Sequence, residues 1–69
     1  MFKCVDKRYI VQSNDLIIAR EKCKLSQTKF AALCGWSPQY QWQLENNKVP
    51  SINEKCKSII ERVLNENSN

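Results

Sequence analysis

The one glycine of this 69-residue chain, Gly35, lies between two short segments that each begin with a helix-capping residue. Ser26 can accept a hydrogen bond from a backbone N–H left free in a first helical turn, which predicts a helix over 27–34. Glycine adopts a positive φ without steric cost, so Gly35 suits the end of that helix and a sharp reversal of the chain. The sequence therefore predicts a short helix followed by a tight turn.

The residues after the turn predict a second short helix. Ser37 is a good N-cap and Pro38 fits the first helical position, where no backbone donor is missed, so the helix should run from Pro38 to Glu45 or Asn46. Its face is rich in amides and carries no Lys or Arg. Two helices at this spacing are typical of a helix-turn-helix unit, whose second helix enters the DNA major groove.

The first 13 residues fit two different patterns. Phe2 and Cys4, then Tyr9 and Val11, alternate around a polar centre, as expected for a small hairpin with one packed face. Phe2, Val5 and Tyr9 also fit helical spacing. The sequence leaves both interpretations open.

Two further helices complete the predicted organisation. Asn14 or Ser13 can cap a helix over 15–24, and Ser51 can cap a last helix over 52–64 with apolar residues at three- and four-residue steps. The polar end of the chain lacks apolar anchors and should fray. The predicted division is an arm or hairpin over 1–13, a helix-turn-helix domain over 14–64 and a disordered tail over 65–69.

Length and charge limit the class of protein. A chain of 69 residues builds one small core, buries only about 60% of its unfolded surface and gains from self-association, which makes a homodimer plausible. The net charge of +4 suits a polyanionic partner, although this is weak evidence alone. The sequence lacks both a 20-residue apolar run and a secretory signal, so we expect a cytoplasmic protein with no membrane partner.

Four cysteines raise the question of a disulfide or zinc site. Cys4, Cys23, Cys34 and Cys56 are scattered singly, and the chain has no histidine to complete a mixed zinc site. A site made of four thiolates stays open, but we expect no metal. Instead, Cys34 and Cys56 should be small core residues, and Cys4 and Cys23 partly exposed thiols.

A set of landmarks along residues 16–64 resembles the phage repressor and Cro family of helix-turn-helix domains. They are Leu25-Ser26-Gln27, Phe30-Ala31, Gly35-Trp36-Ser37, Leu44-Glu45-Asn46-Asn47-Lys48 and Pro50-Ser51. The resemblance implies an all-α fold, a compact lambda repressor-like domain of four or five helices, with a short N-terminal β-hairpin or arm as an addition. It also implies a homodimer that binds double-stranded operator DNA and regulates transcription in a bacterium or a phage-infected host.

Two residues depart from the family pattern. Gln41 stands where the family has an apolar core residue, so either Tyr40 or Trp42 fills the space with Gln41 turned aside, or Gln41 is buried and hydrogen-bonded. Trp42 could also touch thymine methyls or sugar, pack on the N-terminal segment, or serve a dimer contact. Asn47 replaces the glycine that ends this helix, and asparagine tolerates positive φ.

The second helix should supply the base contacts. A glutamine amide can pair with adenine N6 and N7 together, which discriminates by about 1–3 kcal/mol. The candidate base-contacting residues are Pro38, Gln39, Tyr40 and Gln43.

Residues around this helix should hold phosphates without reading sequence. Gln27 is the leading candidate for a phosphate contact, because it starts a helix and the resemblance assigns its position such a contact. The candidate phosphate-contacting residues are Gln27, Ser37, Asn46, Asn47 and Lys48. The resemblance also implies a structural ion pair between Arg20 and Glu45.

Three other functional classes are alternatives to DNA binding. The chain has no histidine, no glycine-rich phosphate loop and only dispersed carboxylates, so we expect neither an enzyme nor a cofactor nor a small-molecule substrate. A protein-interaction module or antirepressor is the main rival, because Tyr40 and Trp42 could face a protein partner. A thiol-based redox or metal sensor is the third alternative.

Overall fold

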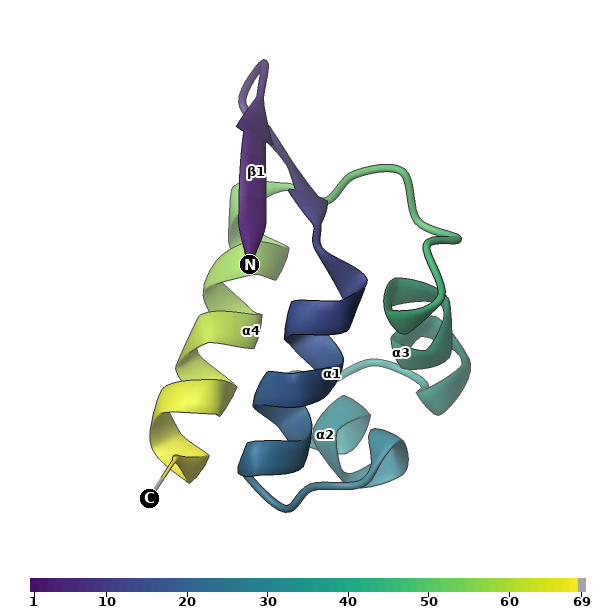
Figure 1. The fold of residues 1–69 in the computed structure, drawn as a ribbon, viewed down its shortest axis with the longest axis vertical. Coiled ribbons are helices and arrows are strands. Elements are labelled where there is room, and N and C mark those ends of the chain that lie inside the picture. Colours follow the sequence, from purple (N-terminus) through teal and green to yellow (C-terminus); the bar gives the residue numbers. More distant parts are fainter. Residues whose placement is uncertain (69) are drawn as a thin grey trace.

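The computed structural model describes residues 1–68, in which a two-stranded hairpin is followed by four helices (Figure 1). The elements are β1 (Phe2–Val5), β2 (Arg8–Val11), α1 (Ser13–Lys22), α2 (Gln27–Cys34), α3 (Pro38–Glu45) and α4 (Glu54–Asn67). The hairpin lies above the first turns of α1 and α4 (Figure 1). In the view of Figure 1, α4 is to the left of α1, and α2 and α3 are to its right.

The prediction of an all-α, lambda repressor-like fold is wrong, because the hairpin is an integral part of the domain. β1 and β2 pair antiparallel, and Tyr9 of β2 also forms a bridge with Ile52 in the segment between α3 and α4. The Tyr9 N–H donates to the Ile52 carbonyl at 2.9 Å, and the Ile52 N–H donates back at 2.8 Å. The fold described over residues 1–68 is therefore a small helical domain with an N-terminal β-hairpin.

The first segment forms the hairpin that its alternating pattern predicts, and not the helix that the second pattern predicts. Phe2 and Tyr9 are partly buried and Val11 is 7% exposed, so one face of the hairpin packs on the hydrophobic core. In a strand, alternate side chains point to one face, which is what this packing requires.

The hairpin turns through two residues that both have positive φ. Asp6 has φ 49° and Lys7 has φ 65°, and Val5 pairs with Arg8 on either side of them. This is the geometry of a type I′ turn, which favours Asn-Gly or Asp-Gly. Asp6 suits it, whereas Lys7 holds a conformation that lysine rarely adopts.

Helix α1 begins and ends earlier than the sequence predicts. Gln12 is its N-cap residue and makes no side-chain capping bond, so the assignment of the cap to Asn14 or Ser13 is wrong. The helix stops at Lys22, and Lys24 has φ 60°. A left-handed residue redirects the chain into the loop before α2.

Helix α4 begins later and ends later than predicted. Asn53 is its cap and accepts a hydrogen bond from the Cys56 N–H at 2.9 Å, so the prediction of Ser51 as the cap is wrong. Ile52 cannot join the helix because its backbone is extended in the bridge to Tyr9. At the other end the helix includes 65–67, part of the predicted disordered tail, and residue 69 lies outside the described residues.

The core is formed by side chains from β2, from all four helices and from the segment between α3 and α4. Its most buried members are 0–2% exposed. They are Leu16, Phe30, Leu44, Ile52, Ile60 and Val63. Because α1, α2, α3 and α4 each contribute at least one of these side chains, α3 is anchored to the body of the domain along one side. In the described part of the chain, no helix has the length and apolar character that crossing a membrane requires.

Candidate nucleic-acid interface

The turn between α2 and α3 is built from local capping interactions. Ser26 accepts from the Lys29 N–H, and Ser37 accepts from the Tyr40 N–H, both at 3.1 Å. Gly35 ends α2 with φ 90°, and the Trp36 N–H reaches back to the Ala31 carbonyl at 3.0 Å. These bonds satisfy backbone groups that helix ends leave free and so fix the start of α3 relative to α2.

Gln41 is buried and hydrogen-bonded at both ends of its amide. The side chain is 0% exposed. Its Oε1 accepts from Trp36 Nε1 at 2.9 Å, and its Nε2 donates to Glu45 Oε2 at 2.7 Å. Of the two alternatives for Gln41, the structure therefore has the buried one, with the desolvation cost offset by hydrogen bonds.

Arg20 of α1 and Glu45 of α3 form the expected pair. Arg20 Nε lies 2.8 Å from Glu45 Oε2, and Arg20 Nη2 lies 3.0 Å from Oε1. The arginine also donates from Nη1 to the Leu25 carbonyl at 2.7 Å. A two-pronged guanidinium–carboxylate contact is directional, so this pair fixes α3 against α1 and the loop before α2.

Glu45 is the centre of this network and stays charged. Burial raises the pKa of Glu45, but hydrogen bonds from Arg20, Gln41 and Gln27 outweigh it and hold the pKa below its ordinary value. Hydrogen bonds to a carboxylate favour its ionised form. The C-terminal end of α3 is therefore fixed by a buried anion with matched donors.

The opposite side of α3 is open to solvent. Gln39, Trp42 and Asn46 are exposed and Gln43 is half-buried. Residues three, four and seven apart share one face of a helix, so these four form what we call the exposed face of α3. Trp42 is 46% exposed, so the interpretation that it fills a lost core contact is wrong.

Two predicted base-contacting residues are not among these four. Pro38 is exposed at the first position of α3. Tyr40 instead turns toward the core, where its ring meets Trp36 edge-on at 5.3 Å and its hydroxyl lies 3.9 Å from Cys56 Sγ. The structure brings Gln39 and Gln43 together on the exposed face and does not bring Tyr40 with them.

The predicted phosphate-contacting amides already make hydrogen bonds within the chain. Gln27 is half-buried and donates from Nε2 to Glu45 Oε1 at 3.1 Å. Asn46 donates from Nδ2 to the Trp42 carbonyl at 2.7 Å. An amide carries two N–H donors, so each side chain retains one for an outside acceptor.

Asn47 has a structural role at the end of α3. Its φ of 59° shows the left-handed conformation that glycine would otherwise supply. Ser13 Oγ lies 2.7 Å from Asn47 Oδ1 and 2.7 Å from the Leu44 carbonyl oxygen, and its single hydroxyl proton serves one of them at a time. Asn47 therefore ties the end of α3 to the start of α1.

Ser37 and Lys48 flank α3 and are both exposed. The Ser37 oxygen caps Tyr40, which leaves its own proton free to donate. In residues 1–68, no side-chain hydrogen bond or ion pair involves the Lys48 ammonium group. Both groups therefore have a proton available for an acceptor outside the described residues.

Sequence reasoning missed the part that Trp36 plays. Its indole N–H is the donor that satisfies the buried oxygen of Gln41. The signal in the sequence was the unexpected amide at a core position, which requires a donor within reach, and a tryptophan lies five residues before it. Trp36 belongs to the support of α3 and not to its exposed face.

The four cysteines are free thiols with different exposure. Cys4 is exposed, Cys23 and Cys56 are partly buried, and Cys34 is buried. Burial, with a smaller contribution from Cys56, raises the pKa of Cys34 to about 12. No group of metal-binding residues that could hold an ion is present among residues 1–68.

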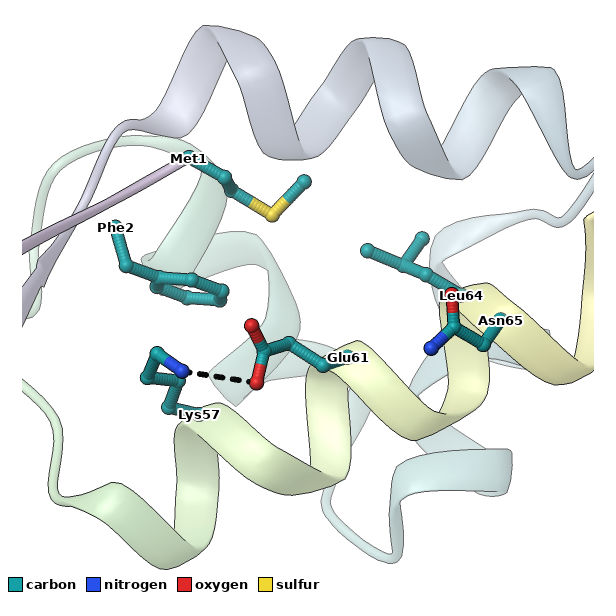
Figure 2. Close-up of a pocket in the computed structure, with 6 residues that line it drawn as sticks. All are labelled: Met1, Phe2, Lys57, Glu61, Leu64 and Asn65. Carbon is teal, nitrogen blue, oxygen red and sulfur yellow. Dashed lines mark hydrogen bonds and ion pairs between the residues drawn. The ribbon is translucent and has the colours of Figure 1, made fainter.

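A hollow of about 570 Å³ lies at a different part of the molecule, between the N-terminus and α4 (Figure 2). Its lining is Met1, Phe2, Lys57, Glu61, Leu64 and Asn65. Lys57 Nζ lies 2.9 Å from Glu61 Oε1 and 5.7 Å from the centre of the Phe2 ring. The hollow contains no residue of α3, so it is separate from the exposed face.

Comparison of the chain with protein-family models, curated proteins and solved structures gives no match in any of the three.

Proposed function

We propose that this protein is a sequence-specific double-stranded DNA-binding regulator of transcription, of the repressor or Cro kind, which reads an operator major groove with α3. The observation that carries the proposal is the contrast between the two sides of α3. One side is fixed by buried Gln41 and Glu45, and the other presents Gln39, Trp42 and Gln43 to solvent. A recognition helix needs both a rigid mount and an open polar face.

The rigid mount supports the proposal because base recognition depends on position. A glutamine amide must meet adenine N6 and N7 together, and this requires the helix to hold its angle in the groove. Helix α3 is held by the core through Leu44, by α1 through Arg20, and by the preceding turn through Trp36. The buried network supplies this precision without occupying the exposed face.

The reading groups in this proposal are Gln39 and Gln43. They are four residues apart on one side of α3, which places them on successive turns facing the same groove. Trp42 lies between them and would contact thymine methyl groups or sugars with its exposed ring edge. Pro38 leads the helix into the groove, and Tyr40 supports it from the core side.

Attraction to the phosphates must come from around α3, since the helix has no Lys or Arg of its own. Ser37 and Lys48 lie at its two ends, and Gln27 lies at the start of α2, where backbone donors favour an anion. The exposed face also has no Asp or Glu to repel a phosphate. A net charge of +4 adds a general attraction.

The test measures affinity for duplex DNA against salt concentration and then selects preferred duplexes from a random library. We expect the affinity to fall steeply as the salt concentration rises. The logarithm of the binding constant should fall linearly with the logarithm of the salt concentration, with a slope of about −0.9 for each phosphate that is neutralised. Gln43→Ala should relax preference at particular base pairs, by about 1–3 kcal/mol at each one. Ser58→Ala, an exposed change on α4, is the matched control and should leave the selected sequence unchanged.

Two results would contradict the proposal. One is that the protein does not bind duplex DNA even at low salt. The other is that Gln43→Ala lowers the affinity for all DNA sequences equally. The second result would assign Gln43 a supporting role in place of base reading.

One observation favours a second candidate, a protein-interaction module or antirepressor that uses the same helix. Trp42 is 46% exposed on a helix with no cationic residue, and exposed tryptophan is frequent at protein-binding sites. Trp42→Ala should then abolish capture of a protein partner with little dependence on salt. Steep salt dependence of DNA binding favours the first candidate.

A further inference from the structure

The outer edge of β1 has unpaired backbone groups. The Gln12 N–H donates to the Met1 carbonyl at 2.8 Å, so Met1 and Gln12 form a hydrogen-bonded pair. Such pairs alternate along an antiparallel ladder, which assigns the next ones to Lys3 with Ile10 and to Val5 with Arg8. The N–H and C=O groups of the intervening β1 residues, Phe2 and Cys4, must then point away from β2.

The other strand of the hairpin does not share this property. Tyr9 of β2 points its backbone groups away from β1 as well, but they are paired with Ile52. Within residues 1–68, no hydrogen bond involves the outward groups of Phe2 or Cys4. The hairpin therefore has one edge closed by its own chain and one edge open.

The open edge lacks two of the features that prevent pairing with another strand, although β1 is short and carries a lysine. β1 has no proline and no bulge, and its register with β2 is continuous. Lys3 is its one charged residue. Val5 and Ile10 on the outward face of the hairpin are 42% and 39% exposed, so further apolar surface lies beside the edge.

We propose that β1 pairs antiparallel with β1 of a second copy of this chain, making a four-stranded sheet across a two-fold axis. A two-fold contact uses the same surface twice, and an antiparallel pair of identical strands meets this condition. A chain of 69 residues also gains from association, because its own core buries a limited share of its surface. This inference goes beyond DNA binding and does not depend on it.

The charge on β1 selects the register. With Lys3 on the axis, two lysines would lie directly opposite each other, which is unfavourable. With Cys4 on the axis, Lys3 lies opposite Val5 of the second copy, and the two Cys4 residues exchange both backbone hydrogen bonds. Of these two registers, the charge on Lys3 favours the one that places the two Cys4 residues opposite each other at the centre of the sheet.

Oxidation tests this register. The Cα atoms of a hydrogen-bonded antiparallel pair are about 5.5 Å apart, within the range of about 4.4–6.8 Å that a disulfide spans. With Lys3 on the axis, the two Cys4 residues would be shifted by two positions along the strand, roughly 7 Å, and out of reach. Mild copper-catalysed oxidation should give a covalent dimer whose cross-link maps to Cys4.

The dimer itself is tested by sedimentation equilibrium of the protein without DNA, so that a failure of DNA binding cannot affect the result. Cys4→Lys places like charges at the axis and should raise the dimer Kd by about fivefold, while Cys4→Ser, the neutral control at the same exposed position, should leave it unchanged. Circular dichroism of both variants checks that the domain is folded.

Three results would overturn the proposal. They are a monomer at the highest soluble concentration, a dimer that Cys4→Lys does not weaken, and a cross-link that maps to another cysteine. Loss of the dimer in Ile18→Glu with no loss in Cys4→Lys would assign the interface to α1, where Ile18 is 51% exposed.

Discussion

Trp36 and Gln41 are joined across the turn before α3 by a hydrogen bond of 2.9 Å from the indole N–H to the amide oxygen. Gln41 is fully buried at a position where an apolar residue would normally pack. The hydrogen bond satisfies the buried amide oxygen and links the turn to α3. A polar network thus replaces part of the apolar contact that would otherwise hold α3.

The first prediction concerns this bond. Trp36→Phe removes the N–H and leaves the buried Gln41 oxygen without a partner, so the free energy of unfolding should fall by about 1–3 kcal/mol. Urea denaturation of both single variants and of Trp36→Phe with Gln41→Leu completes a double-mutant cycle. Strictly additive losses would show that the two side chains are not coupled.

The second prediction is acid sensitivity through Glu45. Its folded pKa is below the ordinary value of 4.5, so the stabilisation is complete above pH 4.5 and is lost as the pH falls through the folded pKa. The Tm should therefore fall more steeply below this pH than it does in Glu45→Gln, which has no carboxyl group to protonate. Parallel curves for the two proteins would contradict this role.

The third prediction concerns the ion pair between Arg20 and Glu45. Glu45→Ala leaves Arg20, whose side chain is 12% exposed, without its carboxylate, and should cost about 3 kcal/mol of unfolding free energy. Glu61→Ala removes an exposed pair with Lys57 and should change stability by less than about 1 kcal/mol. An unchanged Tm in Glu45→Ala would refute the structural role of the pair.

The fourth prediction concerns the hairpin turn. Lys7 has φ 65°, which glycine adopts freely, so Lys7→Gly should stabilise the protein by a few tenths of a kcal/mol up to about 1 kcal/mol. Lys3→Gly, in the middle of β1, should instead destabilise it, because glycine weakens a strand. Thermal unfolding of both variants checks the opposite signs.

The fifth prediction concerns the thiols. Cys4 is exposed, whereas Cys34 is buried and burial raises its pKa to about 12, so Ellman's reagent should modify Cys4 rapidly and Cys34 only on unfolding. Mass mapping after a short exposure identifies the modified residue. Rapid labelling of Cys34 in the folded protein would contradict its placement in the core.

The segment from α2 through the turn to α3 could be predicted from the sequence because its signals are local. The caps at Ser26 and Ser37, the positive φ at Gly35 and the proline at the start of α3 act within a few residues of each other. The bounds of α2 and α3 therefore follow from the order of residues. The first segment fits an alternating pattern and a helical pattern equally well at the local level, so its structure does not follow from the order of residues.

Long-range contacts decided the remaining features. The bridge between Tyr9 and Ile52 joins segments 43 residues apart and holds the hairpin against the rest of the domain. It also keeps Ile52 extended, so α4 begins only at Glu54. No local propensity encodes that pairing.

The direction in which the α3 side chains point was decided in the same way. Gln41 lies inside because Trp36 and Glu45 satisfy its amide there, and Tyr40 turns toward Cys56, which leaves Trp42 exposed. The sequence by itself determined where α2 and α3 begin and end, since capping is settled between near neighbours. Only the tertiary structure decided which amides face solvent, because burial of a polar group depends on partners that the fold brings together.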